Sequence, residues 1–486
     1  MMALSPLLLK AATASNSPFT KYLHAKVQGK ILGINVVMKT PYKLLISSLL
    51  SLTPLLAFAQ PLNLISAYDA ALEHDSDIHA AYQQLQASKE ISPQALADLL
   101  PSINASATSS DVRQESESSF SATATGKDTI QFRDEKFAVS LRQPLFNWAS
   151  FMRYQQANQR VSKAEVEYRL AEQSLIIRLT ERYLNSLQAD VNLTLANDDV
   201  KAFTRQLEQA TIRFEVGLIA ITDVHNAQAR YDLSIATQIA AQDNVYSNEE
   251  ALRQIIQSNE FSLQPLAQTF PLSPPEPNII QQWESSAEQH NLSLQMAKFD
   301  VAIAKKNISI SRAGHYPTVD IVASHTYSET GGSSFGSGFR NEADNLGLEL
   351  NLSLFAGGKT HSLTKQAAFN HQASLDNLQS LQRTTLRETR DAFRGVITSS
   401  RRIKALEQAI VSNKSSLDAN EVGLEVGTRT IVDVLDAQSN LSRAKLQLIQ
   451  ARNGYIINVL SLKAATGSLS RADLEIVNQW LQHDKL

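Results

Sequence analysis

The sequence predicts a membrane β-barrel joined to long α-helices, with two copies of one structural unit in the chain. Apolar and polar residues alternate over stretches of about ten positions, which is typical of barrel strands. Other stretches run for tens of residues without glycine or proline, and similar segments recur 210 positions apart. The 486 residues include no cysteine, which excludes disulfides, thiolate metal sites and cysteine nucleophiles.

The N-terminus carries the features of a secretory signal. We interpret residues 1–37 as an upstream extension and residues 38–59 as a signal peptide, because two lysines precede an apolar run and Ala57-Phe58-Ala59. Cleavage would then leave Gln60 as the first mature residue. A membrane anchor is the alternative, but the apolar run is short and contains Pro54.

Charge and hydropathy restrict the partners of the mature chain. Residues 1–59 hold six lysines and no acid, so the formal charge of −3 for the whole chain becomes −9 for residues 60–486. Such an acidic chain is a poor candidate for nucleic acid binding. No apolar stretch of about 18 residues follows Ala59, so a membrane would be crossed by strands.

Four segments have the pattern of strands. Leucine occupies every second position from Leu346 to Leu354, and Phe137, Val139 and Leu141 alternate with other residues in the same way. Two further strands are expected after Pro101 and after Pro317. A half-buried strand in a soluble sandwich gives the same pattern. Residues 113–135 and 329–344 are rich in Ser, Gly, Thr and charge, and we expect mobile extracellular loops there.

The helical stretches are unusually long. Residues 145–216 contain no glycine or proline, and as one helix they would extend roughly 110 Å at about 1.5 Å per residue. Apolar residues in the second half of this stretch recur mostly every three or four positions, as in a coiled coil. Residues 218–264 form another stretch without glycine or proline. In the second copy Gly395 is expected to interrupt the long helix, at about 1 kcal/mol relative to alanine.

Two motifs mark the duplication. VGLIAITDVHNAQA, from Val216 to Ala229, matches VGTRTIVDVLDAQS, from Val426 to Ser439. The proline-rich residues 265–277 read as the linker. We therefore expect one repeat in residues 60–266 and the second in residues 267–486. Four strands leave two unpaired edges, so several copies of the chain must combine their strands into one closed sheet. The residues alone do not decide between two, three and four copies.

RFEVGLIAITDVHNAQARYD, from Arg213 to Asp232, and VGTRTIVDVLDA, from Val426, resemble the TolC family of outer-membrane efflux proteins. The resemblance extends over residues 61–467. It implies a homotrimer, with a twelve-stranded β-barrel in the cell outer membrane and an α-helical coiled-coil barrel in the periplasm. It also implies a passive duct, not an enzyme, that gives drugs or secreted proteins an exit from tripartite efflux or type I secretion systems.

The same resemblance implies partners and a gate. A periplasmic adaptor (membrane fusion) protein would dock near Val216, Gly217, Val426 and Gly427, and an inner-membrane pump of the RND, ABC or MFS type would supply substrate. Besides these partners it implies contact with outer-membrane lipid, and no cofactor or structural metal. The periplasmic tip would open by untwisting of its helices.

Three residues are expected to latch the gate, namely Thr222, Asp223 and Arg429. An Asp223–Arg429 pair between helices would be a charge-assisted contact. Leu424 stands where the family pattern has a tyrosine, so the hydroxyl link of that tyrosine must be lost or supplied by another residue. We therefore expect a looser or differently connected closed state.

Asp433 and Asp436 share one helix face and would form a cation-selective ring that can bind a blocking multivalent cation. The alternative is structural. Thr430 and Asp433 fit a capping box, and Gly217 and Gly427 fit ordinary helix C-terminal glycines.

An enzyme is not indicated, because nucleophile-elbow, phosphate-loop and HExxH motifs are missing from the sequence. His74, Asp75, Asp77 and His79 suggest a polar helix start rather than a metal site, because helical spacing does not place both histidines on one face. A soluble periplasmic coiled-coil scaffold or tethering protein is the alternative function. It explains the helices, but not the signal peptide or the leucine alternation.

Overall fold

The structure, a computed structural model, describes residues 62–117, 127–258, 261–267, 269–333 and 336–481. All described residues fall in one unit, residues 59–486. The extension and the signal peptide predicted for residues 1–59 lie outside the described residues, so both stay predictions.

Both halves of the chain follow one order: short helices, two strands and two long helices. The elements of the first half are α2 (Leu64–His74), α3 (Ser76–Lys89), α4 (Ile91–Ala97), β1 (Ser102–Glu117), β2 (Lys127–Phe146), α5 (Trp148–Glu215) and α6 (Ile221–Ile256). The elements of the second half are α7 (Ile280–His290), α8 (Leu292–Arg312), a 3-10 turn (Ala313–His315), β3 (Thr318–Ser333), β4 (Gly336–Asn351), α9 (Lys359–Glu425), α10 (Ile431–Ala465) and α11 (Arg471–Asn478). This order is the one that the sequence predicts.

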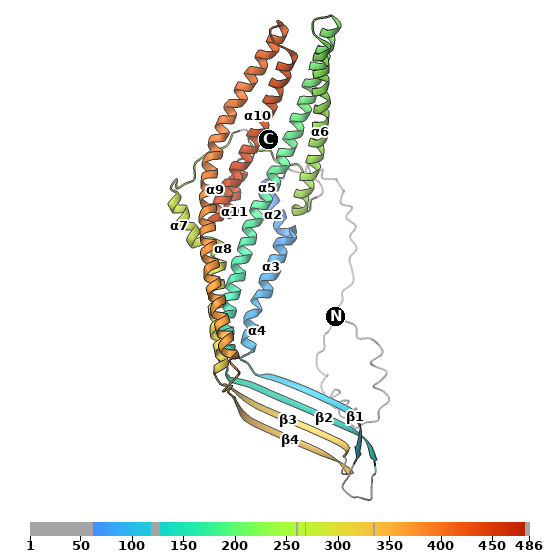
Figure 1. Ribbon diagram of the computed structural model, residues 1–486, viewed down its shortest axis with the longest axis vertical. Helices are drawn as coiled ribbons and strands as arrows, with labels where there is room; N and C mark the ends of the chain where they lie inside the picture. Colours follow the sequence, from blue (N-terminus) through green and yellow to red (C-terminus); the bar gives the residue numbers. More distant parts are fainter. Residues whose placement is uncertain (1–61, 118–126, 259–260, 268, 334–335, 482–486) are drawn as a thin grey trace, which may run out of the picture. The chain divides into compact units, whose positions relative to one another are not determined.

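The strands form one antiparallel sheet in the order β1-β2-β3-β4 (Figure 1). Its register aligns apolar residues across one face: Leu141 lies opposite Ile103 on β1 and Ala323 on β3, and Ala323 lies opposite Leu346 on β4. Leu346 is 81% exposed. Exposed leucines in such a row suit contact with lipid. Among the described residues, β1 and β4 have no strand partner on their outer edges.

The loop prediction is wrong for residues 113–117, 127–135, 329–333 and 336–344, which belong to the strands. Residues 118–126 and 334–335 lie outside the described residues, so the prediction of a loop there stays a prediction. The polar side chains of the strand residues pair across the sheet: Arg133 Nε lies 3.1 Å from Asp111 Oδ1, and Arg340 Nη2 lies 3.0 Å from Glu329 Oε2. Charged cross-strand pairs support a strand without apolar alternation. Conversely, β4 ends at Asn351, so Leu352 and Leu354, which the alternation assigns to a strand, lie beyond it.

The long helices match the prediction closely. The 68 residues of α5 correspond to about 100 Å of helix. Asn147 caps the start of α5 by accepting a hydrogen bond from Ser150 N at 3.1 Å. The helix α6 ends earlier than expected, because Gln257 has a left-handed φ of 50°.

Gly395 does not interrupt α9. A Cβ at this position would lie 2.9 Å from Asn458 Oδ1 on α10, so the missing side chain allows the two helices to approach closely. A glycine that looked like a helix breaker therefore has a packing role.

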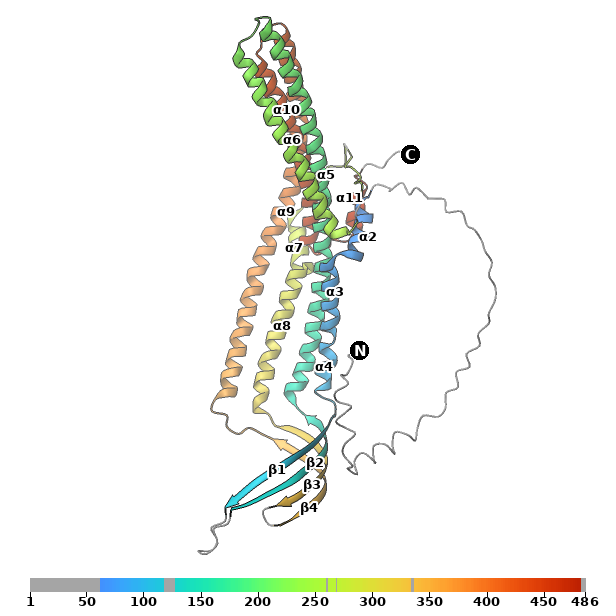
Figure 2. The ribbon, with the colours of Figure 1, turned by 90° about the vertical axis from the view of Figure 1, so that its right-hand side faces the viewer.

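Helices pack side by side along the unit. Figure 2 shows α3, α5, α8 and α9 as neighbours, and α5 contacts both α3 and α8. Tyr183 on α5 is fully buried, and its hydroxyl accepts a hydrogen bond from Gln264 N at 3.1 Å and lies 2.8 Å from Leu62 O. Burial raises the pKa of Tyr183, which keeps its hydroxyl protonated. This contact ties two connecting segments to the middle of α5.

None of the helices within the described residues combines the length and the apolarity needed to cross a membrane.

Candidate functional site: the tips of the two helical hairpins

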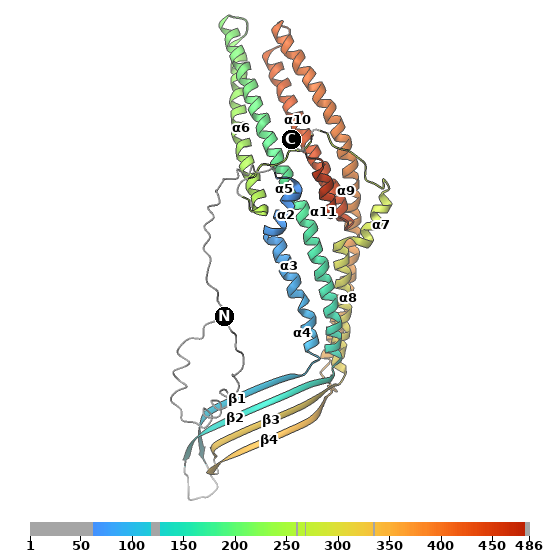
Figure 3. The same cartoon turned by 180° about the vertical axis from the view of Figure 1, so that it is seen from behind.

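Two helical hairpins lie next to each other at the end of the unit farthest from the sheet (Figures 1 and 3). The first hairpin consists of α5 and α6, and the second of α9 and α10. They contact each other through α10, which packs against both α5 and α6. Their turns contain most of the residues that the sequence analysis selects.

The two turns are built in the same way. Gly217 and Gly427 both have a φ of 78°, which glycine adopts without strain. Leu218 N donates to Arg213 O at 2.8 Å, and Thr428 N donates to Gly423 O at 2.8 Å. These are the hydrogen bonds of a Schellman C-cap, so the structural interpretation of both glycines is confirmed.

Apolar side chains surround the turns and remain accessible. Val216 and Val426 are 65% and 69% exposed, and Leu218 is 73% exposed. A Cβ added at Gly217 or Gly427 would meet no heavy atom within 4 Å. The surface of both tips is therefore apolar and open in a single chain, although docking of an adaptor there stays a prediction.

Beneath the turns the hairpins share an apolar cluster. Its buried members are Phe203, Ala210, Ala227, Leu417, Leu424, Ile431, Val434, Leu435, Ala437 and Leu441. Leu424 is 6% exposed. At this position the chain therefore buries a hydrocarbon side chain, whereas a tyrosine would offer a hydroxyl.

A different residue links the hairpins at this level. Arg213 on α5 donates from Nη1 to the backbone oxygen of Leu424 on α9, at 2.9 Å. A hydrogen bond from a charged donor is stronger than a neutral one. Leu424, which has no side-chain hydroxyl, is thus linked to the first hairpin through its backbone oxygen.

The structure places the predicted latch residues on different turns and does not join them. Thr222 and Asp223 lie in the first turn of α6. Arg429 precedes α10 and packs on Gly423, where an added Cβ would lie 2.5 Å from Arg429 Cγ. Within the described residues no ion pair joins Asp223 to Arg429. The latch stays a prediction.

Asp433 caps α10. Its Oδ2 accepts hydrogen bonds from Thr430 N and from Thr430 Oγ1, both at 2.8 Å, and Asp433 N donates to Thr430 Oγ1 at 3.3 Å. The hydrogen bonds from Thr430 and the charge of Arg429 hold the pKa of Asp433 below its usual value. The capping box is confirmed, and the capping carboxylate remains ionised and accessible.

Asp436 is paired. Arg230 Nη2 on α6 lies 2.7 Å from Asp436 Oδ1 on α10, and both side chains are about half exposed. Sequence reasoning missed Arg230, because an arginine on a polar helix face gives no signal of its partner. The one signal in the sequence is a difference between the repeats: the first has an arginine at this position, and the second has Asn440 at the equivalent position.

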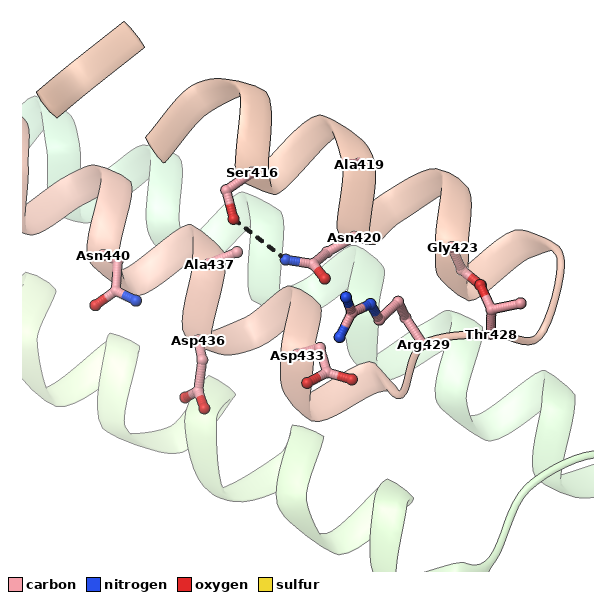
Figure 4. A pocket seen from close by; sticks show the side chains of 10 residues that line it. All are labelled: Ser416, Ala419, Asn420, Gly423, Thr428, Arg429, Asp433, Asp436, Ala437 and Asn440. Carbon is pink, nitrogen blue, oxygen red and sulfur yellow. Dashed lines mark hydrogen bonds between the residues drawn. The ribbon is translucent and has the colours of Figure 1, made fainter. Parts of the chain in front are cut away.

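A polar hollow lies between α9 and α10 beside these acids (Figure 4). Arg429 points toward Asp433 within it, while Asp436 points toward the first hairpin. Its lining is Ser416, Ala419, Asn420, Gly423, Thr428, Arg429, Asp433, Asp436, Ala437 and Asn440. Such a lining can solvate ions and polar groups, and it contains no nucleophile activated by a neighbouring base.

The acidic cluster near residue 75 has a structural role. Asp75 caps α3 by accepting from Asp77 N and Ile78 N, each at 3.0 Å, and pairs with Arg178 at 2.6 Å. Asp77 also pairs with Arg178. The prediction of a polar helix start is confirmed. In the part of the chain that the structure describes, no group of three potential metal ligands is present.

Comparisons with known proteins agree with this architecture. The outer membrane efflux protein family matches residues 67–257 and 283–468. The chain is 33% identical to outer membrane protein TolC of Vibrio cholerae over 432 residues, which cover 86% of this chain and 94% of that protein. It is 30% identical to the alkaline protease secretion protein AprF of Pseudomonas aeruginosa, with 87% of each covered.

A solved structure shows the same fold. The outer membrane channel CmeC of Campylobacter jejuni superposes with a TM-score of 0.70 at 16% identity, over 87% of this chain and 90% of that chain. The four-stranded sheet and the two long hairpins are thus those of an outer-membrane channel. The chain belongs to the outer membrane efflux protein family, the TolC family that its motifs resemble, and is an outer-membrane channel subunit rather than an enzyme.

Proposed function

We propose that three copies of this chain close into one channel, with a twelve-stranded barrel in the outer membrane and a helical tunnel in the periplasm. The observation that carries the proposal is the sheet, with one exposed apolar face and two edges that lack partners among the described residues. Unpaired backbone groups in lipid cost several kcal/mol each, so the edges require further copies. The family relationship favours three.

We propose that the channel gives passive exit to substrates delivered by other proteins. A periplasmic adaptor would bind the exposed apolar tips at Val216, Leu218 and Val426, where a helix or hairpin of the adaptor can bury them. An inner-membrane pump would then select the substrate. The family of efflux proteins and the alkaline protease secretion protein among the relatives favour efflux substrates and secreted proteins as the two classes.

We propose that the tips form the gate. Asp223 and Arg429 do not pair within one chain, so their latch would join neighbouring copies. Asp433 and Asp436 would line the entrance, because the polar hollow that holds them opens beside the turns. Opening would separate the turns as the helices untwist.

Fractionation tests the assembly. The protein should appear in the outer membrane and migrate as a trimer that dissociates on heating. Leu348→Arg places a charge on the apolar face of β4 and should abolish the trimer, because this costs roughly 2–4 kcal/mol per copy at mid-membrane. Asn345→Arg, on the opposite face of β4, is the matched control and should keep the trimer. A monomer in the soluble fraction would refute the proposal.

A further inference from the structure

The face of the sheet opposite the apolar row, which we call the polar face, has an isolated level of charge. This level consists of Arg142, Asp320 and Glu349, each within four residues of the strand end that joins the helices (Figure 1). Over their described lengths β3 and β4 carry no other charge on this face, and β2 carries none before Lys136, about 20 Å further along the strand. The intervening side chains are small and uncharged, namely Ala138, Ser140, Val322, Ser324, Thr326, Ala343, Asn345 and Gly347.

Arg142 neutralises one of the two carboxylates at this level. Asp320 lies directly opposite Glu349 in the sheet, a position in which like charges repel. Arg142 Nη2 lies 2.6 Å from Asp320 Oδ2 and 4.0 Å from Glu349 Oε1. The side chain of Asp320 is only 5% exposed, so the arginine compensates the carboxylate that water cannot reach.

The other carboxylate, that of Glu349, remains accessible. Its side chain is 42% exposed, and its Oε1 accepts a hydrogen bond from Asn351 Nδ2 at 2.8 Å, which orients the carboxylate without neutralising it. One positive and two negative groups leave one negative charge per copy at this level. That charge is the one that an ion beside the sheet meets at Glu349.

Closure of the barrel does not bring a cation to Glu349 from the neighbouring strand. If the apolar face meets lipid, the polar face lines the passage, and β4 of one copy pairs with β1 of the next. On this face β1 carries only uncharged residues, which are Ser102, Asn104, Ser106, Thr108, Ser110, Val112, Gln114 and Ser116. The charge of Glu349 is therefore retained in every register that β1 and β4 can adopt.

We propose that Glu349 is a second determinant of ion preference, located on the wall of the barrel lumen where the strands join the helices. The inference rests on the proposed trimeric channel, in which three copies of this carboxylate surround the passage. A twelve-stranded barrel is wider than the eight-stranded ones that side chains just fill, so the carboxylates attract cations and repel anions through their field rather than as ligands. Arg142 limits this field, because it cancels the charge of Asp320.

The salt concentration decides where this level matters. Screening confines the field of a charge to about 8 Å at 0.15 M salt, whereas it extends to about 30 Å at 0.01 M. At 0.15 M the preference is therefore that of the proposed entrance acids at the tips. In dilute salt the field of Glu349 spans the lumen and adds a preference of its own.

Reversal potentials of the purified trimer in planar bilayers test the inference. The parent protein carries Asp433→Ala with Asp436→Ala, which removes the proposed entrance acids. Adding Glu349→Gln should lower the ratio of cation to anion permeability about twofold or more at about 0.01 M KCl, and should leave it unchanged at about 1 M, where the screening length is about 3 Å. Glu342→Gln is the matched control, because it removes a carboxylate from the opposite face of the same strand, and it should keep the parent ratio at both concentrations.

A cysteine at the same position sets the charge after assembly, since the chain contains no native cysteine. Glu349→Cys in the parent is treated within the bilayer with a thiosulfonate reagent. A reagent that attaches a sulfonate should restore the parent ratio at about 0.01 M salt, and one that attaches an ammonium group should lower the ratio below that of Glu349→Gln.

The outcomes separate this inference from the proposed function. An unchanged ratio in dilute salt, after Glu349→Gln or after either modification of the cysteine, would overturn the role of Glu349 and leave the channel standing. A parent protein and a wild-type protein that both give no conductance at any salt concentration would instead refute the proposed channel.

Discussion

At the residue scale, Arg230 changes the charge that the proposed entrance presents. The sequence supplies two carboxylates, Asp433 and Asp436, on one helix face, but the structure pairs Asp436 with an arginine at 2.7 Å. The net charge at this level is then closer to that of Asp433 alone. An arginine of the first repeat thus offsets the negative charge of an aspartate of the second repeat.

Arg230→Gln should therefore increase the preference of the channel for cations. The substitution removes the positive partner of Asp436, and an exposed pair of this kind is worth about 1 kcal/mol or less, so the permeability ratio should change by roughly twofold to fivefold. Reversal potentials in a salt gradient measure this ratio. Arg205→Gln is the control, because Arg205 Nε donates to Lys201 O of its own helix. An unchanged ratio in Arg230→Gln would argue against an entrance at Asp436.

The lowered pKa of Asp433 gives a prediction for pH. The stabilisation of α10 by the charged cap is present above the unfolded-state pKa of about 3.9 and is lost as the pH falls through the lower folded-state pKa. Cation preference should therefore persist at pH 4 and disappear only below it. Asp433→Ala with Asp436→Ala should lose both the preference and the block by multivalent cations at pH 7.

The exposed acid Asp418, on α9, provides the control for this double variant. Asp418→Ala should keep both the selectivity and the block. Retention of multivalent block by the double variant would show that the blocking site lies elsewhere.

The link from Arg213 to the main chain of Leu424 should protect the end of α9. Arg213→Ala removes a hydrogen bond worth about 1 kcal/mol, so amide exchange in residues 420–427 should become about fivefold faster. Hydrogen exchange followed by mass spectrometry of the trimer measures this. Arg205→Ala should leave the same amides unchanged, and equal exchange in wild type and Arg213→Ala would mean that the link does not restrain the turn.

At the element scale, long regular helices were predictable and strand limits were not. A run of 72 residues without glycine or proline leaves few alternatives to a helix, and α5 fills nearly all of it. The outer halves of the strands escaped prediction because their charged side chains pair across strands, as Asp111 does with Arg133. Such pairs depend on the register, which no local pattern reveals.

The caps of the tip turns were predictable from Gly217, Gly427 and Thr430, because their motifs are local. The links between hairpins were not, because each joins residues about 200 positions apart or more. The tip therefore combines a locally encoded turn with contacts that only the folded chain can show.

Two glycines of the second hairpin should respond to alanine in opposite directions. Gly427→Ala forces alanine to a φ of 78° and should destabilise the turn by about 1 kcal/mol. Gly454→Ala, inside α10 with open space around the added methyl group, should stabilise the helix by about 1 kcal/mol. Hydrogen exchange of α10 measures both. A stabilising effect of Gly427→Ala would contradict the strained position assigned to this turn.

At the scale of the whole molecule, the chain has the sheet and helices of an outer-membrane channel, yet a single copy leaves them incomplete. The apolar row with Leu346 and Leu348 faces outward, and the edges of β1 and β4 lack partners among the described residues. The turns likewise expose Val216 and Val426. Each of these surfaces is explained once several copies surround one passage and a partner covers the tips.

The most direct test of this account is the conductance of the purified mature protein in planar lipid bilayers. The account predicts discrete, equal current steps, with cations favoured over anions, from a particle of three copies. A protein that stays monomeric in water and gives no current steps would contradict it.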